Sequence, residues 1–291
     1  MKKLISVHII ALLVMLSIDI LALSLTNSTV PNFSTAQIAY AIGIGLDQDE
    51  AVSRAKKLER LEVTERNFTL APGKTKQLKY VKIPADASLF ANSEWDTFNP
   101  KVATVDKNGK VTAKKPGVTT ISFSTWGKNY SDSAQTPEIL CYVSTTAPNA
   151  AAFTLNDIQF TSNNHKMDLS ITLTKAKKLF PNGRIVKNEY MDTTNYYHKN
   201  IMFSFYTKSG KLNGIGARDA KTPRGIKIGS NMSDVIAKYG FPTYANGGSE
   251  VAGTGFMLTY EVNRAGLVFS TEYDSDFLKV SAVGLYVNNN N

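Results

Sequence analysis

The chain has 291 residues, of which 43% are hydrophobic and 20% charged, and its formal net charge is +9. This length allows two modest domains and a targeting segment, and the apolar content excludes a chain that is disordered throughout. The positive charge favours anionic partners such as wall polymers, acidic glycans or membrane surfaces. Because no run of Lys and Arg exceeds two residues and no nucleic-acid-binding motif is present, we expect no nucleic acid partner.

The N-terminus has the features of an export signal. A basic start, Lys2-Lys3, precedes an apolar run interrupted by Asp19, and the small-x-small triplet Ala39-Tyr40-Ala41 follows. This pattern is typical of a secretory signal peptide, which predicts that residues 1–41 are removed and that no stable membrane span remains. The competing interpretation is an uncleaved signal anchor, because about 20 apolar residues can span a bilayer. A charge within the run disfavours that anchor, so we expect an extracellular or cell-surface protein.

Residues 42–60 are predicted to form a short helical spacer. Acidic residues begin the stretch Asp47 to Arg60, and basic residues lie toward its end, which suits the dipole of a helix. Its apolar residues recur at near-helical spacing. We interpret this helix as a connection to the first domain.

Residues 61–146 alternate short apolar strands with turns. Val102 to Val105 alternates, Asn108-Gly109 turns the chain, and Val111 to Ala113 resumes the alternation. Asn-Gly between alternating runs is the strongest short-range hairpin signal. Several short strands at this spacing predict an all-β sandwich.

The same stretch resembles the bacterial immunoglobulin-like domain, group 2. The resemblance is carried by Lys101-Val102-Ala103-Thr104-Val105-Asp106, then Asn108-Gly109-Lys110-Val111-Thr112-Ala113, and then Gly117, in the order and spacing of that family. It implies an Ig-like sandwich at the bacterial cell surface, where such modules commonly serve adhesion or matrix association. Trp95 matches the family's tryptophan and is expected to pack between the sheets. The resemblance implies no particular ligand.

An extra polar stretch between Thr125 and Ile139 departs from the family and predicts a long hairpin loop. Trp126 and Tyr130 on this loop are candidate ligand-binding residues, because exposed rings can stack on a sugar or a partner protein and loops often carry recognition. The alternative is that one of the two rings covers the sheet edge. Residues 147–152 are small and polar and contain a proline, which predicts a linker.

Residues 153–291 predict an α+β domain. A helix is expected from an N-cap at Ser230 to Gly240, followed by strands near 256–262, 266–273 and 279–287. A shorter helix from Leu173 and strands at 201–206 and 212–217 repeat this order upstream. The predicted fold is therefore an Ig-like sandwich followed by two helix-plus-antiparallel-meander units that share one curved sheet.

The passage from Ile226 to Pro242 resembles the helix-into-sheet unit of the β-lactamase-inhibitor-protein and outer-membrane-assembly-lipoprotein group. Ile226, Ile228-Gly229, Asp234-Val235 and Tyr239-Gly240 carry the resemblance. Members of that group are small binding modules whose concave sheet grips another protein. The resemblance implies an extracellular protein-binding inhibitor as one possible function.

Catalytic and metal-binding patterns are not recognisable in the sequence. The histidines His8, His165 and His198 lack the spacing of a zinc site. Cys141, the single cysteine, lies in an apolar run, and burial there would raise its thiol pKa and oppose nucleophilic chemistry. Ser53-x-x-Lys56 lacks the other motifs of the penicillin-binding set. We expect no catalytic residue, cofactor or metal site.

Tyrosines and polar residues alternate in a second candidate ligand-binding segment. Tyr190, Tyr196 and Tyr197 lie among hydroxyl, amide and carboxylate side chains, a combination that suits a sugar or peptide surface. The alternative is a loop whose tyrosines pack on the adjacent sheet. We therefore expect an exported, non-enzymatic binding protein in adhesion or in matrix or cell-wall association, with a protein or glycan ligand that could be anionic. The alternatives are a secreted enzyme that acts on wall or glycan substrates through its C-terminal domain, and the inhibitor.

Overall fold

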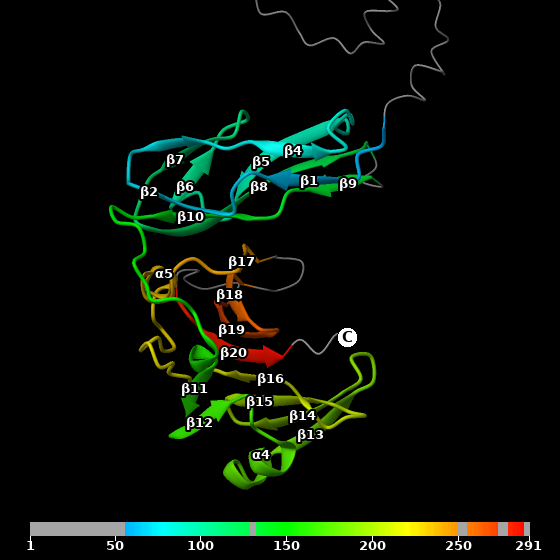
Figure 1. Ribbon diagram of the computed structural model, residues 1–291, viewed down its shortest axis with the longest axis vertical. Coiled ribbons are helices and arrows are strands. Elements are labelled where there is room, and N and C mark those ends of the chain that lie inside the picture. Colours follow the sequence, from blue (N-terminus) through cyan, green and yellow to red (C-terminus); the bar gives the residue numbers. More distant parts are fainter. Residues whose placement is uncertain (1–55, 129–131, 249–254, 273–278, 288–291) are drawn as a thin grey trace, which may run out of the picture. The chain divides into compact units, whose positions relative to one another are not determined.

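The computed structural model describes residues 56–128, 132–248, 255–272 and 279–287 (Figure 1). The predicted signal peptide and most of the predicted helix at 47–60 lie outside these residues. Residues 56–59 have no regular structure, and strand β1 (Arg60–Val63) starts where the helix was expected to end. The prediction of a helix is therefore wrong for residues 56–60. Leu58 and Leu61 are buried beside Phe123, and the segment is extended where β1 pairs with β4.

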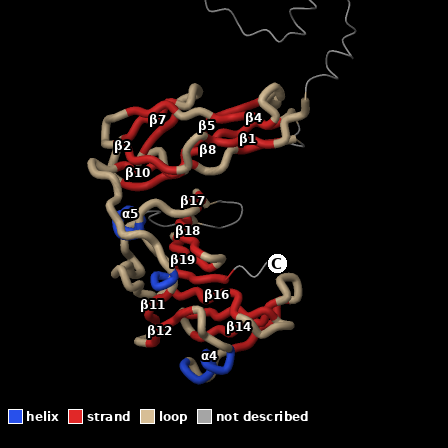
Figure 2. Tube along the Cα trace, viewed as in Figure 1, coloured by secondary structure: helices blue, strands red, loops and turns tan. Residues whose placement is uncertain are grey.

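An Ig-like β-sandwich forms the first half of the described chain, as predicted. Its larger sheet has the order β2-β10-β8-β5, with β9 on β8, and its smaller sheet has the order β3-β7-β6 (Figure 2). β1 pairs separately with β4. The strands are β2 (Asn67–Leu70), β3 (Thr75–Gln77), β4 (Tyr80–Ile83), β5 (Asn92–Thr97), β6 (Ala103–Val105), β7 (Lys110–Ala113), β8 (Gly117–Trp126), β9 (Ser133–Gln135) and β10 (Ile139–Val143).

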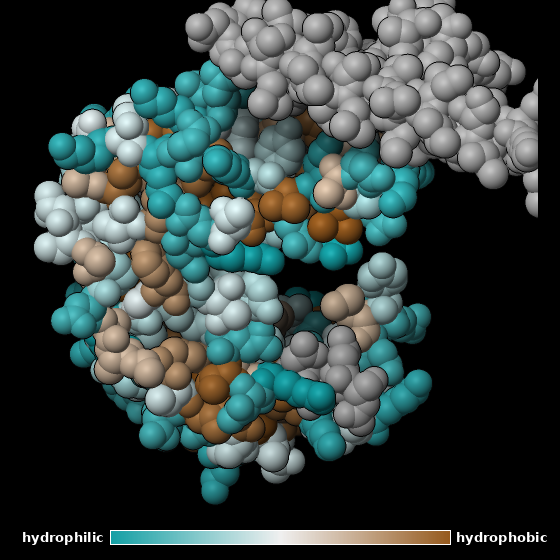
Figure 3. All heavy atoms as spheres, turned by 45° about the horizontal axis from the view of Figure 1, so that its top comes forward, coloured by the Kyte–Doolittle hydropathy of each residue, from teal (hydrophilic) through white to brown (hydrophobic). Residues whose placement is uncertain are grey.

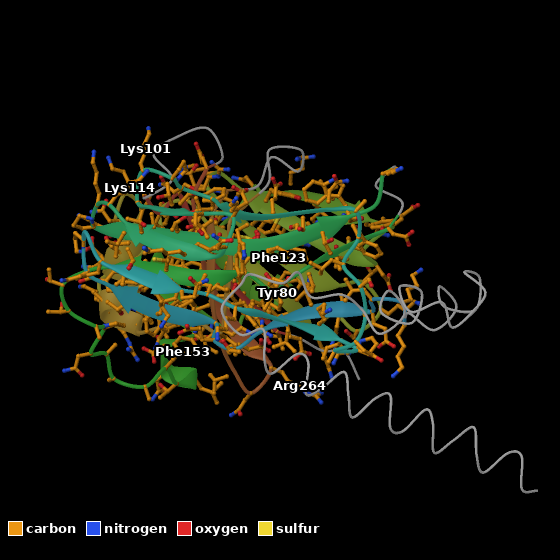
Figure 4. All side chains as sticks on the ribbon, turned by 90° about the horizontal axis from the view of Figure 1, so that it is seen from above. Tyr80, Lys101, Lys114, Phe123, Phe153 and Arg264 are labelled. Carbon is orange, nitrogen blue, oxygen red and sulfur yellow. The ribbon has the colours of Figure 1, made fainter. Side chains whose placement is uncertain are left out.

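The predicted turns and core residues of the sandwich take their expected places. Gly109 closes the β6–β7 hairpin with φ of 81°, a conformation that favours glycine. A Cβ at this position would lie 2.9 Å from the Trp95 ring, so the indole packs directly on the turn. Phe123 stacks on Tyr80 with ring centroids 4.1 Å apart, and both rings lie within the sandwich (Figure 4). Cys141 is fully buried, and burial raises the pKa of its thiol to about 12.

The C-terminal α+β domain contains one eight-stranded antiparallel sheet, built from two units as predicted. Each unit is a short helix followed by four strands, and the units join where β16 pairs with β20, which gives the order β13-β14-β15-β16-β20-β19-β18-β17. The first unit comprises α4 (Leu173–Leu179), β13 (Arg184–Asn188), β14 (Thr193–His198), β15 (Ile201–Tyr206) and β16 (Leu212–Ala217). The second comprises α5 (Met232–Tyr239), β17 (Tyr244–Asn246), β18 (Met257–Val262), β19 (Ala265–Ser270) and β20 (Ala282–Val287).

Several elements of this domain were not predicted from the sequence. A 3-10 turn, η1 (Leu155–Asp157), and a separate hairpin of β11 (Gln159–Ser162) and β12 (His165–Asp168) precede α4. The tyrosine-rich candidate segment, for which a loop was the alternative interpretation, contains β14, an interior strand of the sheet. The N-cap of α5 is Asn231 rather than Ser230, and Asp234 Oδ2 accepts a hydrogen bond from the Asn231 N–H at 3.3 Å.

Both helices pack against the same face of this sheet. The buried residues of α5, among them Val235 and Ile236, belong to one hydrophobic cluster with Ala176 of α4. The strand residues of this cluster include Phe203, Ile215, Leu285, Leu267 and Tyr260, which lie opposite one another in register across five neighbouring strands. Because side chains alternate between the faces of a sheet, this row defines the helix-covered face.

The sandwich and the α+β domain share part of this cluster. Val118, Leu140 and Tyr142 of the larger sandwich sheet are buried together with the core of the C-terminal domain. The Gly247 N–H also donates to Glu138 Oε2 at 2.5 Å. Among the described residues, no helix is both long and apolar enough to cross a membrane.

Candidate ligand-binding face

The alternation of strand β14 places its two tyrosines on opposite faces of the eight-stranded sheet. Tyr196 lies opposite Phe203 on the helix-covered face, and Tyr197 lies opposite Met202 on the other. In the described residues neither α4 nor α5 contributes to this second face, which we call the open face. Register extends it across all eight strands, so its residues can be assigned by pairing alone.

Two neighbouring rows of side chains make up the open face. The first row contains Arg184, Tyr197, Met202, Gly216, Gly284, Val268, Thr259 and Tyr244. The second row contains Val186, Asn195, Ser204, Gly214, Tyr286, Gly266 and Glu261. The face thus combines aromatic, thioether and aliphatic side chains with hydroxyl, amide and carboxylate groups.

Glycines leave the centre of the open face without side chains. A Cβ at Gly216 would have no other atom within 4 Å, so the space above this residue is open. Gly266 differs, because a Cβ there would lie 2.3 Å from Cε1 of Tyr286, whose ring covers the glycine. Arg184 and Tyr197 stand at one end of the first row and Tyr244 at the other, so the centre of the face is lower than its ends.

The polar groups on the open face differ in whether they have a hydrogen-bond partner. Asn195 is only 8% exposed, and its Oδ1 has no hydrogen-bond partner among the described residues. Its neighbour Ser204 has one, since Asn213 Nδ2 donates to Ser204 Oγ at 3.2 Å. Burial, together with the negative charge of Glu261, raises the pKa of Tyr286 to about 12. The phenol therefore stays protonated and can donate a hydrogen bond at neutral pH.

The structure separates the three tyrosines that the sequence grouped. Tyr197 belongs to the open face, where the Arg184 guanidinium lies 5.3 Å from its ring centroid. Tyr190 is 96% exposed in the turn between β13 and β14. Tyr196 is only 2% exposed, and its hydroxyl accepts from the Gly183 N–H at 2.9 Å and donates to the Phe180 carbonyl. Tyr196 is a core residue, so its assignment to a ligand-binding surface is wrong.

The predicted hairpin loop holds the other two candidates, far along the chain from the tyrosines. Trp126 ends β8 and pairs with Ser133 of β9, so the extra stretch forms a hairpin as expected. The indole lines a shallow groove of about 390 Å³ together with Glu94, Ser124 and Gln135. Tyr130 lies outside the described residues. The four candidates within the described residues thus occupy different settings: the core for Tyr196, the open face for Tyr197, an exposed turn for Tyr190 and a groove of the sandwich for Trp126.

Four residues of the open face were missed or not singled out by sequence reasoning: Met202, Tyr244, Tyr286 and Asn195. A signal for them was present in the glycines. Gly214 and Gly216 both lie inside β16 and are on the same face as Gly284 of β20. Glycines at alternate positions of adjacent strands indicate a face that other atoms approach closely.

A second hollow lies beside the sandwich, with a volume of about 510 Å³. Arg66, Asn67 and Glu138 line it from the sandwich, and Tyr244 lines it from β17. Burial raises the pKa of Glu138, although hydrogen bonds from Thr120 and Gly247 oppose that effect. The described residues contain no group of three or more His, Cys, Asp or Glu side chains that could hold a metal ion.

Exposed apolar side chains gather at one end of the α+β sheet. Ile185, Tyr190 and Met191 are all well exposed on or beside the edge strand β13. The face of the molecule drawn in Figure 3 is largely hydrophilic, with hydrophobic side chains in a few groups. Ile185 pairs with Tyr196 and so belongs to the helix-covered side of this edge, whereas Arg184 pairs with Tyr197 on the open face.

Comparisons with known proteins identify one part of the chain. Residues 58–128 match the model of the bacterial Ig-like domain, group 2. A structure of surface layer protein SbsC, domains 1–6, is 12% identical with a TM-score of 0.20, and the match covers 81% of this chain and 25% of that one. A DUF4784 family protein from Bacteroides caccae is 12% identical with a TM-score of 0.18, and the match covers 81% of this chain and 71% of that one.

The search of curated protein sequences found no match. The two structural likenesses have TM-scores too low to carry an argument about fold or function. The family match confirms the resemblance drawn from the strand and turn pattern. The chain therefore carries a bacterial Ig-like domain, group 2, at residues 58–128.

Proposed function

We propose that this chain is an exported, surface-associated binding protein without enzymatic activity, which holds a protein ligand on the open face of its C-terminal sheet. The Ig-like domain supports the surface location, because domains of this group commonly belong to bacterial surface proteins. The basic and apolar N-terminal sequence supports export. Adhesion or matrix association is the role we propose for the whole chain.

The main observation behind the proposal is the uninterrupted row from Arg184 to Tyr244 across eight strands, which no helix among the described residues covers. Eight strands about 4.8 Å apart span about 34 Å, and six residues along a strand span about 20 Å, which gives an area of about 700 Å². This is close to the roughly 800 Å² per partner of a standard protein interface. Tyr, Met and Arg, which the row contains, are enriched in such interfaces.

The low centre of the face favours a partner with a protruding backbone or side chain. Such a group can approach Gly216 closely while rings at the two ends contact its flanks. Asn195 Oδ1 is enclosed by the protein, so the polar groups that a ligand can reach are those of exposed side chains such as Arg184 and Tyr244.

The test uses a side chain added to the centre of the open face. Gly216→Gln fills open space and should leave the fold intact, whereas a bound partner would collide with it. The full chain and this variant are each used to capture ligands from an envelope extract, with bound species identified by mass spectrometry and glycan analysis. Thr174→Gln, at an exposed position of α4 away from the open face, is the matched control.

The proposal predicts a protein captured by the wild type and by the control but not by Gly216→Gln. Capture that is equal for all three proteins contradicts the assignment of the open face. If the wild type captures a polysaccharide and Gly216→Gln does not, the ligand of the open face is a glycan rather than a protein. Cleavage of a wall polymer or glycan by the wild type would favour the secreted enzyme instead.

A further inference from the structure

The smaller sheet of the sandwich carries an unusual concentration of one charge. Between residues 101 and 115 there are five lysines and a single acid, Asp106. These five lysines are exposed, and so is Lys74 in the turn between β2 and β3. We call this set the lysine face; it consists of Lys74, Lys101, Lys107, Lys110, Lys114 and Lys115.

Backbone hydrogen bonds bring four of these lysines, Lys74, Lys101, Lys114 and Lys115, together at one end of the smaller sheet. Lys107 and Lys110 lie at its other end, on either side of the Asn108-Gly109 turn. The Ala113 N–H donates to the carbonyl of Lys74 at 3.0 Å, which places Lys74 beside the end of β7. The N–H groups of Lys114 and Lys115 donate to the carbonyl of Val102 at 2.8 and 3.2 Å, beside Lys101. Figure 4 shows Lys101 and Lys114 close together at one end of the sandwich, with both side chains directed away from it.

One acid, Asp106, offsets part of the positive charge of Lys107 and Lys110. In the part of the chain that the structure describes, none of the six lysines forms an ion pair, whereas their neighbour Lys76 is paired with Glu65 at 3.1 Å. The nearby carboxylate of Asp106 accepts from the N–H groups of Lys110 and Asn108 at 3.0 and 2.9 Å. These hydrogen bonds lower the pKa of Asp106 and engage its carboxylate in the turn.

The side chains between the lysines indicate which class of anion can bind to this face. Thr75, Thr104 and Thr112 lie in register on the outward side of the sheet, and Gln77 lies opposite Lys110. These groups offer hydrogen bonds but no ring on which a nucleic acid base could stack. Lysine ammonium groups are mobile point charges, which suit repeated anionic groups on a flexible chain better than one planar carboxylate.

We infer that the lysine face binds a linear polyanion whose phosphate groups repeat along a non-aromatic backbone. The larger sheet carries the residues buried against the C-terminal core, so the smaller sheet is free to bind a second partner. This site is separate from the open face and does not depend on the protein ligand proposed there. It would anchor the chain to an anionic polymer while the C-terminal domain engages its own ligand.

Linear polyphosphate is the probe, and binding to the full chain is measured by titration calorimetry between about 50 and 300 mM salt, a range over which such contacts weaken strongly. The variant carries Lys101→Gln, Lys114→Gln and Lys115→Gln. The control carries Lys175→Gln, Lys177→Gln and Lys178→Gln on α4, which removes the same charge from exposed lysines elsewhere. Thermal unfolding of both variants checks that each remains folded.

We expect the lysine-face variant to bind at least about tenfold more weakly at low salt. Its slope of log K against log salt should fall by about 2, because each phosphate contact on a single-stranded polyanion contributes about 0.7. The control should change neither value appreciably. Equal losses in both variants, or no binding by the wild type at low salt, would overturn the proposal. So would tighter binding to phosphatidylglycerol vesicles than to polyphosphate, since that result assigns the face to a membrane.

Discussion

Arg224 and Asp157 form a two-pronged ion pair, with Nε 2.7 Å from Oδ1 and Nη2 2.7 Å from Oδ2. The remaining guanidinium hydrogens donate to three carbonyls: those of Ala151, Ala152 and Lys238, at 2.8, 2.8 and 2.9 Å. All five N–H donors of the arginine therefore have acceptors. The predicted linker at 147–152 is thus tied at its end to η1 and to helix α5.

Replacing this arginine should destabilise the protein even when the charge is kept. Both side chains of the pair are largely buried, at 18% and 10% exposed, and a lysine cannot supply the five donors. We expect Arg224→Lys to lower the free energy of unfolding by about 3 kcal/mol, as for other broken buried pairs. The measurement is denaturant unfolding followed by circular dichroism.

Arg60 provides the control, because its pair with Glu62 is 60% and 48% exposed. Arg60→Lys should change the free energy of unfolding by less than about 1 kcal/mol. If Arg224→Lys is equally mild, the contacts of Arg224 do not contribute to stability as the geometry indicates.

The same pair predicts how stability depends on acid. Burial alone would raise the pKa of Asp157, but hydrogen bonds from Arg224 and Thr154 outweigh it, so the pKa lies below its usual value. A depressed pKa stabilises the folded state above the unfolded value, about 3.9, and this stability is lost as the pH falls through the folded value. Asp157→Asn should therefore be less stable than the wild type at pH 6, with a difference that shrinks below about pH 4. A constant difference across urea titrations from neutral to acidic pH would contradict the assignment.

Glu138 predicts a pH dependence of the opposite sign. Burial raises the pKa of this carboxyl, so its ionisation costs the folded state more than the unfolded state. The stability it contributes is present at low pH and is lost as the pH rises through the folded pKa. In Glu138→Gln the amide oxygen can still accept from the Gly247 N–H. The usual pKa of a Glu carboxyl is about 4.3. This variant should therefore gain stability relative to the wild type as the pH rises from about 4 to 7. Thermal unfolding at several pH values measures this; a relative loss at neutral pH would show that the ionised form is the one the site favours.

Two glycines of the open face should respond oppositely to alanine. Gly216→Ala meets no other atom and removes conformational freedom from the unfolded chain, so it should raise stability by about 0.4–1 kcal/mol. Gly266→Ala would place its methyl group 2.3 Å from the Tyr286 ring and should be destabilising. Melting temperatures of the two single variants test this directly. Similar values would show that the Tyr286 ring moves aside without cost, and that its position on the open face is not rigid.

Local signals were sufficient for many of the elements. The strands at 201–206 and 212–217 were predicted with their observed bounds, and the Asn108-Gly109 hairpin lies where expected. Each depends on a pattern within a few residues. The short strands β13 and β17 lack such a pattern, because they lie at the edges of the sheet and bury few side chains.

The binding face could be predicted only in part. Tyr196 and Tyr197 are adjacent and chemically similar in sequence, so nothing local distinguishes the core residue from the exposed one. The distinction comes from the pairing with Phe203 and Met202 and from the position of α4. A shift of one residue in this register would exchange the two tyrosines.

The sequence by itself determined the Ig-like module, the turns, the helix–strand order of the second half and the burial of Cys141, since each follows from local spacing and hydrophobicity. Only the tertiary structure decided that β16 joins β20, that the open face runs across both units, and that Arg224 reaches Ala151, Ala152 and Asp157. These relationships join residues that are distant along the chain. They depend on strand register and on the side of the sheet that the helices cover, which no short stretch of sequence specifies.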